Sequence, residues 1–218
     1  MIRNIIFDFG GVLLDLDPQR CIDRFEAIGY TEIREKLSMA HQKGVLGNIE
    51  LGLVTVSELC DEIRTSIAGA KGDTTVEELP SNAEIVKAFC SMADGIPQYR
   101  LDFVNELKQK GYQVDALSNT NAVHWGYCQR YFVECGYVPE ELFGHVWLSN
   151  ELHMAKPDVR IFEYVLSDAG YSADETLFVD DNERNCEVAR FVGIHTFCPK
   201  VRTDWRSEFS DLLATLNK

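Results

Sequence analysis

The chain has 218 residues and a formal net charge of −14 at pH 7, a length that suits one large domain or a domain with a smaller one attached. Such an acidic protein is a poor partner for nucleic acid or an anionic membrane, because phosphate backbones and anionic lipids attract lysine and arginine. No apolar run approaches the roughly 20 residues of a membrane-spanning helix, and we expect no signal peptide.

The first predicted element is a buried strand over residues 2–7, a short run of mostly apolar side chains. Asp8 follows it directly, and Gly10 and Gly11 then allow a sharp turn or a close approach of the backbone to a ligand. A carboxylate at the end of a central parallel strand stands in the crevice where open α/β sheets bind ligands.

Residues 18–95 show helical periodicity and almost no strand signal, so we expect an all-helical insert there. Its predicted helices cover residues 20–28, 32–42, 55–67 and 83–92, with Ser57 as the N-cap of the third. We expect a turn at residues 48–52 and a loop at residues 69–73.

Strands and helices alternate after the insert. The predicted strands cover residues 112–117, 145–148, 176–179 and 195–198, and the predicted helices cover residues 99–110, 124–135, 158–169, 183–192 and 205–216. This order implies a parallel sheet with helices on both faces, joined by the first strand from before the insert. The predicted fold class is therefore α/β.

Seven cysteines are scattered through the chain without any C-x-x-C spacing. This usage favours reduced thiols and a cytoplasmic location over a disulfide framework or a zinc site.

Polar side chains stand where the predicted strands end, or in the loops beyond them. These are Asp8, Ser118, Lys156, Asp180 and Asp181. They can converge, because the carboxyl ends of parallel strands share one edge. Two carboxylates about 4 Å apart repel by roughly 4 kcal/mol at an effective dielectric constant near 20. The acids therefore need a cation, which Lys156 and a hard ion such as Mg²⁺ supply, and the set suits a phosphate group.

Lys156 and Pro157 precede a predicted helix. Pro157 suits the first helical position, and the start of a helix offers free N–H groups and a positive dipole end beside the lysine. Taken alone, Lys156 reads as a solvated surface charge, and Asp180 with Asp181 reads as a helix cap. The order of all the elements together favours a site.

Four motifs of the chain resemble those of the haloacid dehalogenase superfamily of hydrolases: FDFGGVL at residues 7–13, LSNTN at 117–121, KPD at 156–158 and FVDDN at 178–182. The resemblance covers essentially the whole chain and is greatest to bacterial sugar-phosphate phosphatases of that superfamily. It implies a Rossmann-like core domain of residues 1–17 and 96–218, with an inserted helical cap domain of residues 18–95. It also implies a Mg²⁺-dependent phosphatase acting on a small phosphorylated metabolite.

The resemblance assigns the phosphoryl transfer to four residues. Asp8 would be the nucleophile that forms an aspartyl-phosphate. Ser118 would bind the phosphoryl oxygens with help from the Asn119 backbone, and Lys156 would neutralise Asp8 and the transferred group. A carboxylate nucleophile divides the hydrolysis into two steps, and phosphoryl transfer needs mainly positioning and charge neutralisation.

The resemblance also implies a Mg²⁺ site made by Asp8, the Gly10 carbonyl, Asp180 and Asp181. The string DFG at residues 8–10 occurs in protein kinases too. We reject that match, because the chain has no Gly-rich loop before it, no catalytic-loop signature and too few residues.

Gly10 departs from the family pattern. Most phosphatases of the superfamily carry a second Asp at this position as general acid and base, which is typically worth about 10²–10⁴ in rate. Three hypotheses follow: Asp15 or Asp17 replaces the missing acid, the leaving group departs with little protonation, as from a sugar 1-phosphate, or the protein is an inactive phosphate-binding regulator.

A metal-independent 2-haloacid dehalogenase is a further alternative, although clustered acids bring nothing to a metal-free site. Neither the residues of the cap that contact substrate nor the choice between monomer and homodimer follows from the sequence.

Overall fold

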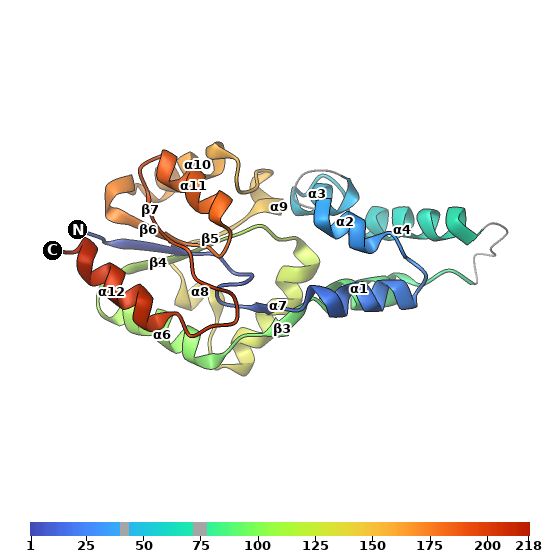
Figure 1. Ribbon diagram of the computed structural model, residues 1–218, viewed down its shortest axis with the longest axis horizontal. Coiled ribbons are helices and arrows are strands. Elements are labelled where there is room, and N and C mark those ends of the chain that lie inside the picture. Colours follow the sequence, from blue (N-terminus) through green and yellow to red (C-terminus); the bar gives the residue numbers. More distant parts are fainter. Residues whose placement is uncertain (40–43, 72–77) are drawn as a thin grey trace.

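A computed structural model describes residues 1–39, 44–71 and 78–218. Five strands form one parallel sheet in the order β5-β4-β1-β6-β7 (Figure 1). They are β1 (Asn4–Phe7), β4 (Gln113–Ser118), β5 (Val146–Leu148), β6 (Thr176–Val179) and β7 (His195–Phe197). The predicted α/β fold class with a parallel sheet is thereby confirmed. β1 lies in the middle, so Asp8 stands at the centre of the sheet edge.

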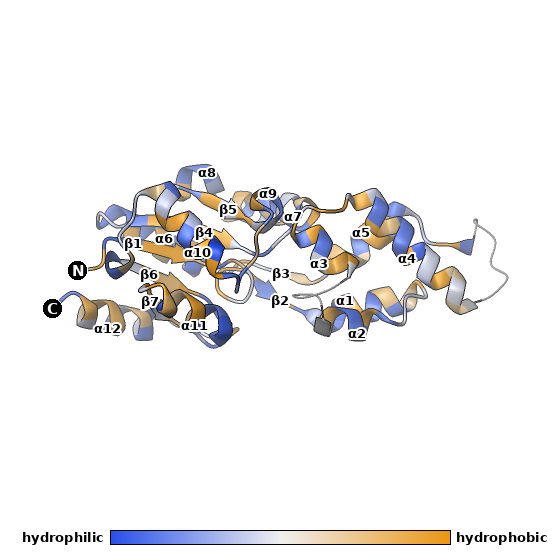
Figure 2. Cartoon of the chain, turned by 90° about the horizontal axis from the view of Figure 1, so that it is seen from above, coloured by the Kyte–Doolittle hydropathy of each residue, from blue (hydrophilic) through white to orange (hydrophobic). Residues whose placement is uncertain are grey.

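Helices cover both faces of the sheet (Figure 1). One face carries α6 (Gln98–Gln109), α7 (Ala122–Glu134), α8 (Pro139–Leu142) and α12 (Arg206–Leu216). The other carries α10 (Val159–Ala169) and α11 (Glu183–Phe191), while α9 (Ser149–Leu152) follows β5 and the short 3-10 turn η2 (Ala173–Glu175) precedes β6. Figure 2 shows hydrophobic residues along the central strands, and both hydrophobic and hydrophilic residues on the helices around them. The helices therefore pack through one face only.

The helical insert extends beyond the carboxyl ends of the strands (Figure 1). Its helices are α1 (Pro18–Ala27), α2 (Ile33–Met39), α3 (Val45–Glu50), α4 (Val56–Lys71) and α5 (Asn82–Cys90). They enclose a hydrophobic cluster of their own, to which Phe25, Ile63 and Ile85 contribute side chains without solvent exposure. The division of the chain into core and cap domains at residues 17 and 95 stays a prediction.

Two details of the insert differ from the sequence predictions. The stretch does not end in helix, since β3 (Ala93–Gly95) pairs antiparallel with β2 (Asp15–Leu16). The predicted turn at residues 48–52 is half helix, because Val45, Leu46 and Ile49 are buried on one side of α3. Packing of those three side chains outweighs the turn signal of Asn48 and Gly52.

Both ends of α4 and the start of α10 also differ. Thr55 rather than Ser57 caps α4: its hydroxyl accepts from the Glu58 N–H at 3.2 Å, and its own N–H donates to the Glu58 carboxylate at 2.7 Å. α4 continues to Lys71, so residues 69–71 of the expected loop are helical. α10 begins after Asp158, whose side chain accepts from the Arg160 N–H, and Pro157 lies before it.

The last residues of the predicted helix 32–42 and of the predicted loop 69–73 lie outside the described ranges. Within those ranges, no helix is both long and apolar enough to cross a membrane.

Candidate active site

Strand register brings Asp8 and Asp180 together. Phe7 pairs with Val179 between β1 and β6, and each aspartate is the next residue of its strand. The Asp8 N–H donates to the Val179 carbonyl at 2.7 Å, which continues the ladder by one bond. Asp8 is 8% exposed and Asp180 is fully buried. The expected convergence at the sheet edge therefore occurs.

Lys156 joins these two carboxylates. Its Nζ lies 2.7 Å from Asp8 Oδ1 and 2.7 Å from Asp180 Oδ2, and it also donates to the Leu117 carbonyl at 2.9 Å. Three acceptors satisfy the three donors of the ammonium group. The lysine is 2% exposed, so it is part of a buried charge cluster and not a solvated surface charge.

Burial and the neighbouring charges shift the pKa values of Asp8 and Lys156. Burial raises the pKa of Asp8 to about 7, even though Lys156 acts in the opposite direction. Burial lowers the pKa of Lys156, but Asp180 and Asp8 outweigh it and hold that pKa above its ordinary value. Lys156 is thus held as the cation that the acids require.

Asp180 is held by four hydrogen bonds. Its Oδ1 accepts from the Asn182 N–H at 2.8 Å and from Asn185 Nδ2 at 3.0 Å, and its Oδ2 accepts from Lys156 and from Asn185 Nδ2 at 3.0 Å. These bonds fix the orientation of the carboxylate. Asp180 is therefore well suited to positioning Lys156. The sequence did not predict this role of Asp180, nor the part that Asn185 plays in holding its carboxylate.

The Asp181 carboxylate lies close to those of Asp8 and Asp180. A Cβ added to Gly11 would lie 2.5 Å from the Asp181 carboxylate carbon, and Gly11 has φ +81°. Only glycine allows both the left-handed backbone and that close approach. The close approach of Asp181 therefore requires Gly11, the second glycine of the pair.

The acids fit a divalent cation. Asp8, Asp180 and Asp181 each offer a carboxylate oxygen, and these oxygens lie within 4.8 Å of one another. Mg²⁺ takes oxygen ligands at about 2.1 Å in octahedral geometry, so carboxylates this close together can converge on one ion. One lysine leaves the three carboxylates with surplus negative charge. The residues present therefore fit the metal that the sequence predicts.

Ser118 and Asn119 lie at the carboxyl end of β4. The Ser118 hydroxyl makes no hydrogen bond to the described residues, and the residue lines a pocket beside Gly10. The Asn119 side chain is used structurally: its Nδ2 donates to the Lys156 carbonyl at 2.7 Å, and its Oδ1 accepts from the Lys156 N–H at 2.8 Å. Asn119 thus fixes the lysine backbone.

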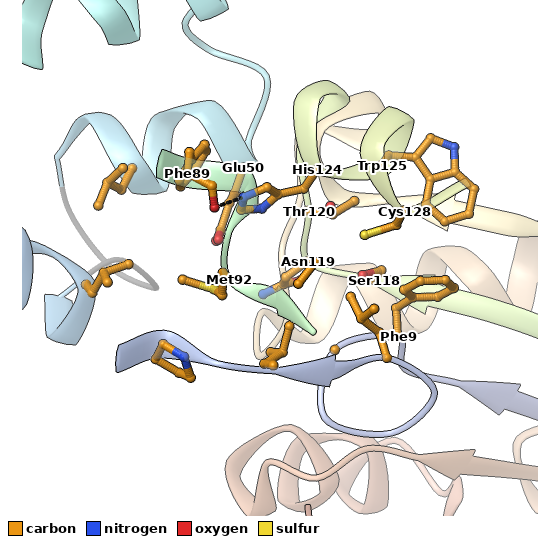
Figure 3. Close-up of a pocket in the computed structure, with 17 residues that line it drawn as sticks. Phe9, Glu50, Phe89, Met92, Ser118, Asn119, Thr120, His124, Trp125 and Cys128 are labelled. Carbon is orange, nitrogen blue, oxygen red and sulfur yellow. Dashed lines mark hydrogen bonds between the residues drawn. The ribbon is translucent and has the colours of Figure 1, made fainter. Parts of the chain in front are cut away.

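The pocket has a volume of ≈260 Å³ and lies between the sheet edge and the helical insert. Figure 3 shows Ser118 and Phe9 near one end and Phe89, Glu50 and His124 at the other. A small organic group attached to a phosphate at the Ser118 end would extend toward the insert.

Leu16 occupies the room next to Gly10. A Cβ on Gly10 would lie 3.1 Å from Leu16 Cδ1. The acids proposed as substitutes have other partners: Asp15 pairs with Arg100 at 2.9 Å, and Asp17 accepts from the N–H of Arg20 as the N-cap of α1. Neither lines the pocket, so the structure does not support Asp15 or Asp17 as the proton donor.

Comparison with known proteins agrees with the site. The family model for haloacid dehalogenase-like hydrolases matches residues 2–193. A D-ribitol-5-phosphate phosphatase from Bacteroides thetaiotaomicron is 32% identical over 215 residues, which are 98% of this chain and 99% of the relative.

Solved structures are similar over the same length. A HAD family enzyme from Bacteroides thetaiotaomicron, an aspartate-to-alanine mutant in complex with magnesium and inorganic phosphate, is 39% identical, with a TM-score of 0.86 over 96% of this chain and 99% of that one. A predicted HAD-like family hydrolase from Porphyromonas gingivalis is 30% identical, with a TM-score of 0.83 over 98% of each chain. The resemblance seen in the motifs is confirmed: this chain belongs to the family of haloacid dehalogenase-like hydrolases.

Proposed function

We propose that this chain is a Mg²⁺-dependent phosphatase that hydrolyses a sugar phosphate or a similar small metabolite through an aspartyl-phosphate on Asp8. The observation that carries the proposal is the contact of one buried lysine with both Asp8 and Asp180, beside Asp181. Phe9 and Gly10, which follow Asp8 in the chain, line a small pocket. The phosphatase class and the magnesium cofactor also agree with the relatives described above.

Asp8 is oriented for attack. Its Oδ1 accepts from the Phe9 N–H at 2.6 Å and from Lys156 at 2.7 Å. Its Oδ2 makes no hydrogen bond within the described ranges and is the oxygen that would attack phosphorus. The Oδ2–P bond forms while the bond from phosphorus to the ester oxygen breaks, and water then hydrolyses the aspartyl-phosphate.

Charge neutralisation accounts for the remaining residues. Lys156 neutralises Asp8 and the transferred group, and Ser118 donates to a phosphoryl oxygen. Asp8, Asp180 and Asp181 with the Gly10 carbonyl would hold a Mg²⁺ ion, which would supply further positive charge at the phosphoryl oxygens.

The leaving group is the finer part of the proposal. No described acid stands at the position of the general acid, so an alcohol that leaves with little protonation suits the site best. A sugar 1-phosphate has such a leaving group, because the ring oxygen makes the anomeric hydroxyl more acidic than an ordinary alcohol. The similarity to a D-ribitol-5-phosphate phosphatase supports a small polyhydroxy phosphate as the substrate.

The test is hydrolysis of p-nitrophenyl phosphate with Mg²⁺ or with EDTA. Its leaving group needs no proton, so the absence of a general acid matters little. We expect Mg²⁺-dependent turnover by the wild type, no turnover by Asp8→Asn, and normal turnover by Asp174→Asn, a matched change at an exposed aspartate. Undiminished turnover by Asp8→Asn would contradict the proposal.

Absence of turnover with Mg²⁺ would favour the two alternatives. Activity on 2-chloropropionate in EDTA would identify a dehalogenase, and Mg²⁺-dependent binding of phosphate esters without product would identify an inactive regulator. The clustered carboxylates argue against the first of these, because a metal-free site would have to keep three acids together with one lysine.

A further inference from the structure

A second pocket lies where the helical insert meets the core. Its walls come from α1, the end of α5, β3 and α7 (Figure 1), and its volume of ≈370 Å³ is within the range of small-molecule sites. Among the described residues, it shares only Ala93 with the pocket at the sheet edge, and none of Asp8, Ser118 and Lys156 lines it. A ligand in this second pocket would therefore leave the phosphoryl site open.

The charged side chains that line the second pocket are mostly basic. Arg20, Arg24 and Lys87 face it together with one acid, Asp94. The whole chain has a net charge of −14, so the sign of the charge is reversed here. A concave site lined by one sign of charge attracts small ions of the opposite sign.

Asp94 does not neutralise the pocket, because its carboxylate is already paired twice. Its Oδ1 lies 2.7 Å from Arg20 Nη1, and its Oδ2 lies 2.7 Å from Nη2 of Arg202, which does not line the pocket. Arg20 also donates through Nε to the Ser91 carbonyl at 2.7 Å. Arg20 and Asp94 are thus structural parts of the wall, and Asp94 has no charge to spare for other cations.

Arg24 and Lys87 have no such partners. Neither side chain makes a hydrogen bond or an ion pair with residues 1–39, 44–71 or 78–218. They come from helices that pack against each other, α1 and α5. The acids beside them on these helices are bonded elsewhere: Asp23 to Gln19, Glu26 to Arg34 and Glu84 to Ser81. Two cations that face one cavity repel each other, and an anion between them removes that repulsion.

The wall opposite the insert is preformed. The Arg130 guanidinium lies 3.4 Å from the ring centroid of Tyr127 and 5.0 Å from that of Tyr131. The Tyr131 hydroxyl donates to the Ala93 carbonyl at 3.4 Å, and Arg20 Nη2 donates to the same oxygen at 2.8 Å. One carbonyl thus joins α1 to α7 across the pocket. A preformed site binds more tightly, because less entropy is lost in ordering its side chains.

We propose that the second pocket binds the phosphate group of a small anion between Arg24 and Lys87. The anion is either free phosphate or a metabolite that carries a phosphate group. The guanidinium of an arginine matches two phosphate oxygens at once, and a lysine adds a compact charge. This site is separate from the proposed active site, so the inference goes beyond the proposed function and does not depend on it.

The test is a titration of the whole protein in EDTA, followed by NMR of its backbone amides. The probes are inorganic phosphate and glycerol 3-phosphate. We expect saturable shifts of the amides of residues 20–24 and 87, which do not line the pocket at the sheet edge. Tighter binding of the ester would identify a metabolite as the ligand, and tighter binding of inorganic phosphate would identify the free ion.

The double variant Arg24→Gln with Lys87→Gln should raise the Kd measured at residues 20–24 by about 10-fold or more, because it removes two charge-assisted contacts. Both side chains are exposed, so the fold should persist. Lys110→Gln with Lys200→Gln is the matched control: it removes the same charge at two exposed positions outside the pocket, and it should keep the wild-type Kd.

Three results would overturn the inference. The first is the absence of shifts at residues 20–24 and 87 with about 20 mM of either probe, which would fill a site with a Kd of about 1 mM. The second is an equal Kd in the two double variants. The third is equal shifts with sodium acetate at the same ionic strength. Shifts at residues 118–121 report on the proposed active site separately and should be the same in all variants.

Discussion

Restoring an acid at position 10 is the most informative perturbation of this site. The Gly10 backbone does not have the positive φ that would exclude a side chain. What stands in the way is Leu16, whose Cδ1 lies 3.1 Å from the place of a Cβ. That distance is short, but the atom is the tip of a flexible side chain. The double variant Gly10→Asp with Leu16→Ala should therefore accommodate the carboxyl group.

The size of the effect depends on the leaving group. General acid catalysis is typically worth about 10²–10⁴ in rate, or roughly 3–5 kcal/mol of activation free energy. The full gain requires an ideal geometry that an engineered acid will not reach. We therefore expect about a 10- to 100-fold rise in kcat/KM for ribitol 5-phosphate, whose leaving alcohol needs a proton, and less than about threefold for p-nitrophenyl phosphate.

Both substrates are assayed with Mg²⁺ in the wild type, in Leu16→Ala, and in the double variants that carry Asp or Asn at position 10. The Asn variant matches the size of Asp without its proton. The reasoning predicts that the wild type hydrolyses p-nitrophenyl phosphate far faster than ribitol 5-phosphate and that only the Asp variant narrows the gap. If the wild type hydrolyses the two at similar kcat/KM, a proton donor is present that the account does not contain.

Three further predictions concern stability. Gly11→Ala should lower the free energy of unfolding by more than about 1 kcal/mol, because φ is +81° and the Cβ would lie 2.5 Å from the Asp181 carboxylate carbon. Gly136→Ala is the control for the backbone contribution alone, since Gly136 has φ +79° and open space around it. Equal losses of unfolding free energy in the two variants would disprove the close approach. Asn185→Ala, which removes both Nδ2 bonds to Asp180, should cost about 1.5–3 kcal/mol in urea unfolding, and an unchanged midpoint would contradict its positioning role. Burial holds the pKa of His124 below its ordinary value, although the Phe89 carbonyl and Glu50 oppose this. The unfolded chain therefore takes up a proton near pH 6.5 that the folded chain does not, so the stability of the wild type relative to that of His124→Phe should fall as pH drops from about 7 to 5.

The order of strands and helices could be predicted from the sequence, because apolar periods and glycine stops are local signals. The helix α3 could not. Asn48 and Gly52 read locally as a turn, and the helix exists because Val45, Leu46 and Ile49 bury their side chains in the insert. Such burial depends on tertiary packing against α4 and against α9, which is distant in sequence, and no local signal shows it.

The residues of the site also divide into those that the sequence predicts and those that it does not. Asp8 and Asp180 could be placed together because parallel strands share an edge, and the sequence alone predicts that. Asn185 could have been predicted as a polar contact of the site, since a polar residue on the buried side of α11 beside Cys186 needs a hydrogen-bond partner. Glu50, which lines the pocket at the sheet edge, could not, because the contact of its carbonyl with the Ser149 hydroxyl joins residues 99 positions apart, and no motif marks either one.

The central claim is that Asp8 carries the phosphoryl group during turnover. The direct measurement is acid quenching of the wild-type enzyme during hydrolysis of p-nitrophenyl phosphate with Mg²⁺, followed by mass spectrometry of its peptides. We expect one phosphoryl group on the peptide that contains Asp8 and none in Asp8→Asn. Steady release of product with no phosphorylated Asp8 peptide at any quench time would contradict it.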